Sequence, residues 1–161
     1  LSMLNSSNDL LESVLMGGRI ARQKIEHPPI FILGHWRSGT TLLHNLMTLD
    51  PQFTYPNLYQ VMYPGNFLLT EKVTTRLTGW VLPATRPMDN IPTGWNLPQE
   101  DEMALLVMTL MSPYLMLAHQ GDPEKTRRFF DLAELTPDEN RRWRLLNKRW
   151  SHFLFKLLQR R

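Results

Sequence analysis

Apolar residues recur every three or four positions along much of this chain, which is the spacing of an amphipathic helix. The pattern is clear in residues 10–25, 41–49 and 67–77, and again after the capping-box sequence Thr-Pro-Asp-Glu at residues 136–139. We expect a helix in each of these segments. Two of them should bury a stripe of large side chains: Leu11, Val14, Leu15 and Ile20 in the first helix, and Trp143, Leu146, Trp150, Phe153, Leu154 and Leu157 in the last.

Two further helices are expected between these segments. Pro98 suits the first position of a helix, so one should begin there, and residues 122–132 have the pattern of a short polar helix. Residues 103–118 are the most apolar stretch, but they fall short of the roughly 20 residues that a bilayer requires. Ser112 and Pro113 also interrupt them. We therefore expect a buried helix followed by a turn, and no transmembrane segment.

Residues 30–33 form a continuous apolar run, which predicts a strand covered on both faces. No second convincing strand occurs, and a single buried strand cannot make a sheet. The expected fold class is therefore α/β with a parallel sheet, of which this chain supplies a helix-rich N-terminal part with one core strand. Its neighbouring strands would come from sequence beyond Arg161. An unpaired strand and an uncovered helix stripe also predict that the isolated chain folds poorly or self-associates.

Composition narrows the possible functions. At 161 residues, 42% of them hydrophobic and 20% charged, the chain suits one globular domain. It contains no cysteine, which excludes disulfides, thiolate zinc sites and cysteine nucleophiles. The start shows no signal-peptide pattern, so we expect a cytoplasmic protein. Residues 141–161 carry eight Lys or Arg residues and no acid. They could meet an anionic partner, but a solvated helix face is the more common meaning, and we expect no nucleic-acid partner.

The candidate chemistry lies in residues 31–43, which read as a strand, a glycine-bounded turn and a helix. This arrangement aims backbone N–H groups and a helix N-terminus at one point, where a phosphate or sulfate binds well. Gly34 lets the chain leave the strand sharply, and Gly39 lets the backbone approach the anion. In the nucleotide-hydrolysing loop GxxxxGK[ST] a lysine follows the second glycine. Thr40 stands there instead and the cation is Arg37, so a P-loop kinase fits poorly.

The sequence Arg37-Ser-Gly-Thr-Thr41 resembles the 5′-phosphosulfate loop of sulfotransferases, which use 3′-phosphoadenosine 5′-phosphosulfate (PAPS) as donor. Residues 29–44, 59–61, 86–90 and 98–105 together resemble a bacterial-type sulfotransferase family, from about residue 20 onward. The resemblance implies a P-loop-like sulfotransferase fold, and the chain matches roughly its N-terminal half. We expect one partial domain: a helical lead-in (1–28), the strand, loop and helix (29–50), and acceptor-side loops and helices (51–161).

The resemblance also implies site residues. The donor would be held by residues of the loop: Gly34, His35, Trp36, Arg37, Ser38, Gly39, Thr40 and Thr41. Arg37 would neutralise the leaving group. A general base should come from the acidic residues 100–102. The resemblance favours Glu100, then Glu102, although acids also favour the first turn of a helix because of its dipole. At most one or two of the three should face the pocket.

Other residues of the same region have weaker claims to a role. His35 could touch the donor or acceptor, or make a structural hydrogen bond. We expect His44 to be a packed core histidine. Trp36, Trp80 and Trp95 could line an acceptor site, although packing is the default. No cluster has convincing metal-ligand spacing, and PAPS chemistry needs no metal.

The function that follows is transfer of a sulfuryl group from PAPS to a hydroxyl or amine. The acceptor would be a small molecule, a carbohydrate or a lipid. Its identity stays open, because no substrate-reading motif is recognisable. Two alternatives remain open at this point. The chain could be a non-catalytic fragment or an anion-binding interaction module that uses its basic C-terminal helix, and a P-loop kinase is less favoured. Steep salt-dependent association without PAPS affinity would favour the module.

Overall fold

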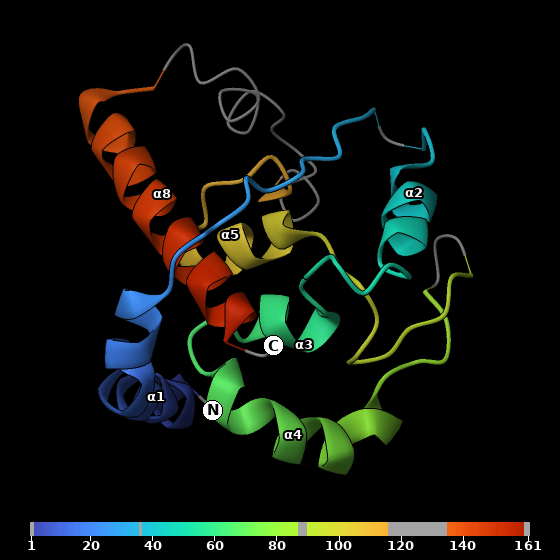
Figure 1. Cartoon of the computed structure of the whole chain (residues 1–161), viewed down its shortest axis with the longest axis horizontal. Helices are drawn as coiled ribbons and strands as arrows, with labels where there is room; N and C mark the ends of the chain where they lie inside the picture. The colour runs from blue at the N-terminus through green and yellow to red at the C-terminus, as the bar shows by residue number, and fades with distance from the viewer. Residues whose placement is uncertain (1, 36, 87–89, 116–134, 160–161) are drawn as a thin grey trace.

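The computed structural model describes residues 2–35, 37–86, 90–115 and 135–159, and within these ranges the protein is helical. The helices, in chain order, are α1 (Ser2–Arg22), α2 (Thr40–Met47), α3 (Leu58–Met62), α4 (Phe67–Thr78), the short 3₁₀ helix η1 (Gly79–Val81), α5 (Asp101–Thr109) and α8 (Pro137–Leu158). Figure 1 shows α3 and α5 beside the long helix α8, with α1 and α4 along one side and α2 set apart. The helix expected at residues 122–132 lies outside the described residues.

The prediction of a core strand and a parallel sheet is wrong. Residues 30–33 are extended but form no strand, and the described residues contain only two isolated bridges, Asn57 with Pro98 and Thr85 with Pro92. Leu33 is 88% exposed, so this run is not covered on both faces. A strand is held by hydrogen bonds to a neighbouring backbone, and no described segment pairs with these residues. An apolar run alone therefore did not make a strand here.

The core lies where α3, α4, α5 and α8 meet. Its buried members are Tyr59, Val61, Phe67, Ala104, Phe153 and Leu157. The stripe expected on the last helix is confirmed, because Leu146, Phe153 and Leu157 are buried and the other members are half-buried. The capping box is confirmed too: the Thr136 hydroxyl accepts from the N–H of Glu139, and the Glu139 carboxylate accepts from the N–H of Thr136.

Helix α1 buries a different face from the one its pattern predicts. Val14 is 74% exposed and Leu11 and Leu15 are also exposed, while Glu12 and Ile20 are buried. Only Ile20 of the expected stripe is confirmed. The exposed leucines are apolar surface of the kind that the expected self-association requires, and that expectation stays a prediction.

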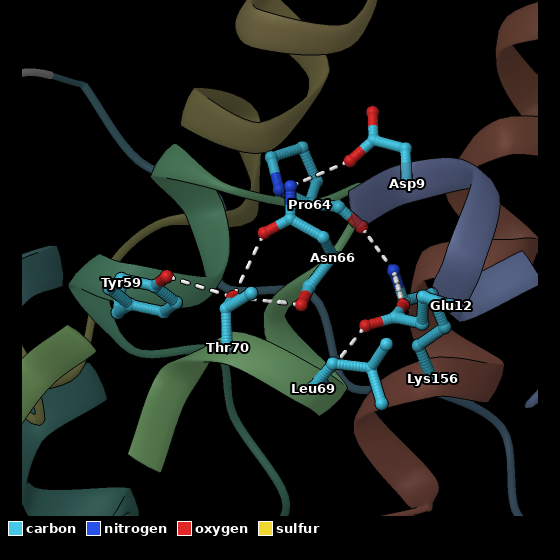
Figure 2. A network of polar contacts seen from close by, with 8 residues as sticks. All are labelled: Asp9, Glu12, Tyr59, Pro64, Asn66, Leu69, Thr70 and Lys156. Carbon is cyan, nitrogen blue, oxygen red and sulfur yellow. Dashed lines mark hydrogen bonds and ion pairs between the residues drawn. The ribbon is translucent and has the colours of Figure 1, made fainter. Parts of the chain in front are cut away.

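A buried ion pair explains why a carboxylate of α1 turns inward. Glu12 pairs with Lys156 of α8, and both side chains are almost fully buried. Glu12 also accepts from the N–H of Leu69 at 3.1 Å, and the Lys156 ammonium donates to the carbonyl of Pro64 at 2.5 Å. Burial lowers the pKa of Lys156, and Glu12 opposes that shift. The pair joins α1 and α8 to the start of α4 (Figure 2).

Further polar contacts extend this network toward α3 (Figure 2). The amide of Asn66 donates to Asp9 at 2.6 Å, and its side-chain oxygen accepts from Thr70 at 2.9 Å. Thr70 in turn accepts from the hydroxyl of Tyr59 at 2.9 Å. Buried polar groups are stabilising only when they are hydrogen-bonded. The network therefore fixes the α3–α4 turn against α1.

The apolar stretch near residue 103 is a helix followed by a turn, as expected, but Ala104 is the only fully buried residue of that helix. Helix α5 ends at Thr109, Leu110 takes a left-handed conformation with a φ of 55°, and the buried Met111 and Ser112 begin a turn. Helix α5 begins at Asp101 rather than at Pro98. Over the ranges that the structure covers, every helix is too short or too polar to cross a bilayer.

Candidate donor loop and acidic cluster

The loop between residues 34 and 39 is shaped by two left-handed backbone positions. Gly39 precedes α2 with a φ of 93°, and Arg37 has a φ of 62°. Such a φ is costly for a residue other than glycine, and strained residues of this kind cluster at functional sites. Alternation of left-handed and right-handed residues curls the backbone so that its N–H groups converge on an anion. The loop conformation therefore fits the predicted donor-binding role.

Contacts inside the loop hold it closed. The Ser38 hydroxyl donates to the carbonyl of His35 at 2.5 Å, and the Ser38 N–H donates to the same oxygen at 3.1 Å. A Cβ atom on Gly34 would lie 2.6 Å from the Thr40 methyl group and 2.8 Å from the Ser38 hydroxyl. Gly34 is therefore required by the close approach of the loop to itself. Trp36 lies outside the described residues.

The N-terminus of α2 is open to an anion. The first hydrogen bond of this helix runs from the N–H of Leu43 to the carbonyl of Gly39, at 3.0 Å. The N–H groups of Thr40, Thr41 and Leu42 consequently have no acceptor within the helix. Gly39 has no side chain to cap them. Orphan N–H groups and the positive end of the helix dipole both favour phosphate or sulfate.

One cavity of about 1590 Å³ connects this helix to the acidic residues. Gly34, Thr40, Thr41 and His44 line it from the loop and α2, and Glu100, Asp101 and Glu102 line it from the start of α5. His35, Arg37, Ser38 and Gly39 belong to the loop but are not on the cavity wall. The structure thus brings the helix N-terminus and all three acids to one space. All three acidic residues line the cavity and are partly buried. The expectation that at most one or two of their side chains face the pocket stays a prediction.

Each acidic side chain has a different hydrogen-bond partner. Glu100 accepts from the hydroxyl of Tyr114, Asp101 accepts from the indole N–H of Trp150 at 2.8 Å, and Glu102 is bonded to Ser112. The backbone before them is anchored as well, since the N–H of Gln99 donates to the carbonyl of Pro56 at 2.9 Å. The cluster is therefore held by three parts of the chain: α8, the turn after α5 and the segment before α3.

Burial shifts the pKa values of two cavity residues, Glu102 and His44, in opposite directions. It raises the pKa of Glu102, helped by the neighbouring charges of Asp101 and Glu100 and opposed by the Ser112 hydrogen bond. It lowers the pKa of His44, and the same two charges oppose that shift. The imidazole is thus neutral at neutral pH. Its ring meets Tyr55 edge-on at 6.2 Å between centroids. His44 is half-buried on the cavity wall rather than enclosed in the core.

The aromatic residues of the cavity are not the ones expected. Trp80 is 84% exposed, and Trp95 packs edge-on against Tyr59 and donates to the carbonyl of Thr78. The wall instead carries several aromatic residues that the sequence analysis had assigned to the core or left without a role: Phe31, Tyr55, Tyr114, Trp143 and Trp150. The two tryptophans share a face of α8, which was a usable signal. Nothing in the sequence pointed to Tyr114.

No group of three metal-ligating side chains lies close together within the described ranges. The arrangement combines the exposed N-terminus of α2 and its adjoining arginine-bearing loop with a group of hydrogen-bonded carboxylates.

A comparison with known protein families agrees with the interpretation of the loop and the acidic segment. Residues 28–160 match the sulfotransferase family, and the protein belongs to that family.

Two mycobacterial proteins are similar to it, from Mycobacterium bovis and Mycobacterium tuberculosis, and both are named omega-hydroxy-beta-dihydromenaquinone-9 sulfotransferase Stf3. Each is 40% identical over 144 residues, which are 89% of this chain and 37% of the relative. The chain thus spans little more than a third of the length of these relatives. No solved structure matches it.

Proposed function

We propose that the protein takes part in transfer of a sulfuryl group from PAPS to a hydroxyl or amine of an acceptor. The observation that carries this proposal is the shared cavity, in which the N-terminus of α2 and the carboxylates of residues 100–102 meet. Sulfuryl transfer needs an anion site for the donor and a proton acceptor for the nucleophile, and candidates for both line this cavity. Membership of the sulfotransferase family supports the same reaction.

On the donor side, the N–H groups at the start of α2 and the hydroxyls of Thr40 and Thr41 bind the 5′-phosphosulfate. Arg37 neutralises charge on the departing phosphate, since a guanidinium is permanently charged and planar. Its exposed position in the loop leaves its long side chain able to reach a bound donor. By analogy with phosphoryl transfer, positioning and electrostatics supply most of the rate enhancement.

On the acceptor side, Glu100 acts as the general base, with Glu102 as the second candidate. The acceptor oxygen forms a bond to sulfur while the bond from sulfur to the 5′-phosphate oxygen breaks. The electron pair of that bond stays on the phosphate, and the acceptor proton passes to the carboxylate. Glu100 lies at the N-terminal end of α5 and on the cavity wall, which is where an acceptor would approach the donor.

The acceptor we propose is a hydroxyl carried by a largely apolar molecule. The names of both relatives specify an omega-hydroxy compound. The wall of the cavity is rich in apolar side chains, among them Phe31, Leu105, Leu154 and Leu158. Such a wall buries an apolar chain favourably while the carboxylates receive its polar end. The acceptor-side assignment of residues 51–161 is part of this proposal.

The test is Glu100→Gln in the complete protein, assayed with PAPS and an omega-hydroxylated prenyl quinone. Glutamine keeps the shape and accepts the Tyr114 hydrogen bond but cannot take the proton. We expect kcat to fall by about 10²–10⁴ while PAPS binding and Tm stay close to wild type.

Asp101→Asn is the matched control, because it shares the helix dipole and keeps an acceptor for Trp150. If the acids serve only the dipole, both changes should cost about 0.3–1 kcal/mol of stability and leave the rate intact. Equal, small effects at both positions would remove Glu100 as the base.

A further inference from the structure

The residue that holds Glu100 comes from the turn after α5, not from the loop or from α5 itself. The hydroxyl of Tyr114 donates to Oε2 of Glu100, fourteen positions away in the chain. Tyr114 also lines the cavity and is half-buried there. We propose that Tyr114 is a positioning residue for the reaction, which fixes the Glu100 carboxylate so that its other oxygen receives the acceptor proton. The inference rests on the proposed function of Glu100.

The backbone around Tyr114 is built to hold this position. The left-handed Leu110 ends α5 and turns the chain back. The buried Ser112 then accepts twice: its side-chain oxygen accepts from the N–H of Tyr114 at 3.1 Å, and its carbonyl accepts from the N–H of Leu115 at 3.1 Å. Pro113 restricts the backbone between them. The phenol ring is consequently presented to Glu100 by a stiff turn.

The opposite side of the hydrogen bond is equally constrained. The N–H of Glu100 donates to the side-chain oxygen of Gln99 at 3.1 Å, and Gln99 is itself tied to Pro56. A glutamate side chain has several rotamers of similar energy, and a general base must lie within hydrogen-bond reach of the proton it takes. Tyr114 selects one rotamer and occupies one oxygen.

Tyr114 can serve only as a donor in this arrangement. Burial raises its pKa, the hydrogen bond to Glu100 raises it further, and the acidic neighbours add to the effect. The phenol therefore keeps its proton throughout the assay range, and it is the donor in its hydrogen bond to Glu100. The charged and titratable groups that interact with this pair are Asp101 and Glu102 of α5 and His44 of α2.

The experiment is Tyr114→Phe in the complete protein, with Tyr63→Phe as the matched control. Tyr63 packs against Tyr59 away from the cavity, so its hydroxyl should not affect turnover. For Tyr114→Phe we expect kcat to fall about tenfold or more, which is the loss of one hydrogen bond to a charged group. KM for PAPS should not change, because Tyr114 lies against Glu100 and not in the donor loop.

A second measurement tests whether Tyr114 acts through Glu100. In the double variant Glu100→Gln/Tyr114→Phe, kcat should equal that of Glu100→Gln alone, because Tyr114 acts only through Glu100.

The outcomes separate this inference from the proposed function. If Glu100→Gln lowers kcat but Tyr114→Phe leaves kcat unchanged, Tyr114 has no positioning role. If Tyr114→Phe lowers both Tm and kcat, and the double variant is slower than Glu100→Gln alone, Tyr114 is a structural clamp instead. If Glu100→Gln leaves kcat unchanged, the proposed base is wrong and the positioning role falls with it.

Discussion

Replacing Lys156 with methionine is the most direct test of how the helices are held together. Lys156 is 2% exposed and Glu12 is 1% exposed, so the ion pair between them is shielded from solvent. Methionine keeps most of the aliphatic volume and loses the ammonium group, which lies 4.6 Å from the centroid of the Phe67 ring. The substitution therefore removes the charge and little of the packing.

The expected loss of stability follows from the polar groups that remain buried once Lys156 is replaced. Without Lys156, the Glu12 carboxylate is buried with the N–H of Leu69 as a donor, and the carbonyl of Pro64 loses its charged donor. Removing one partner of a buried pair typically costs about 3–5 kcal/mol, because the other charge is left uncompensated. A typical domain has about 5–15 kcal/mol of stability in total, so this is a large share.

The assay is urea denaturation of the complete protein followed by far-ultraviolet circular dichroism. Lys148→Met is the matched control, because Lys148 is exposed on the same helix and its loss should cost no more than about 0.5 kcal/mol. The double variant Glu12→Gln/Lys156→Met should recover part of the loss. It removes the buried charge and keeps an acceptor for Leu69.

Two results would refute this reasoning. Lys156→Met within about 1 kcal/mol of wild type would mean that Glu12 reaches water or a proton at little cost. A double variant less stable than Lys156→Met would mean that the carboxylate, not its pairing, stabilises the fold.

Two other predictions concern the loop and the cavity. Arg37→Ala in the complete protein should lower kcat by about 10²–10³ and change PAPS affinity far less, because the contact of the guanidinium strengthens as charge builds on the leaving group. An unchanged kcat in steady-state kinetics would remove that role from Arg37. The folded-state pKa of His44 is lowered from 6.5, so the unfolded chain takes up this proton first as the pH falls. The contribution of His44 to stability should therefore be lost as the pH falls from 6.5 through the folded-state pKa. In urea denaturation at a series of pH values, His44→Asn should lose less stability than wild type over that interval. Parallel plots of stability against pH for the two proteins would contradict the lowered pKa.

Helix periodicity and capping were reliable guides to the local elements. Helix α8 begins at Pro137 and buries the stripe that its pattern predicts, and α4 occupies the expected residues. These features depend on residues within one or two turns of each other. The five-residue helix α3 was missed, although Asn57 and Gln60 form a capping box before it. Its apolar run is too short to show a period.

Local sequence patterns could not predict which face of a helix is buried or whether a segment pairs with another. The apolar stripe of α1 predicted which face is buried, but Glu12 is buried instead, because Lys156 lies 144 positions away in the sequence and provides the opposite charge. The run at residues 30–33 had the composition of a strand, but it pairs with no backbone in the part of the chain that the structure describes. Both predictions failed for the same reason. The buried face of a helix and the formation of a strand depend on segments distant in the sequence, whereas the pattern of apolar residues is local.

For the candidate site, the sequence by itself determined the kind of chemistry. The glycine spacing, the arginine and the acidic triplet are properties of contiguous residues, because a turn and a helix start are built from neighbours. Only the tertiary structure decided that this triplet shares a cavity with Thr40 and Thr41, and that Tyr114 and Trp150 hold two of its carboxylates. Hydrogen bonds between distant segments depend on how helices pack, and packing is a property of the whole chain rather than of any window of it.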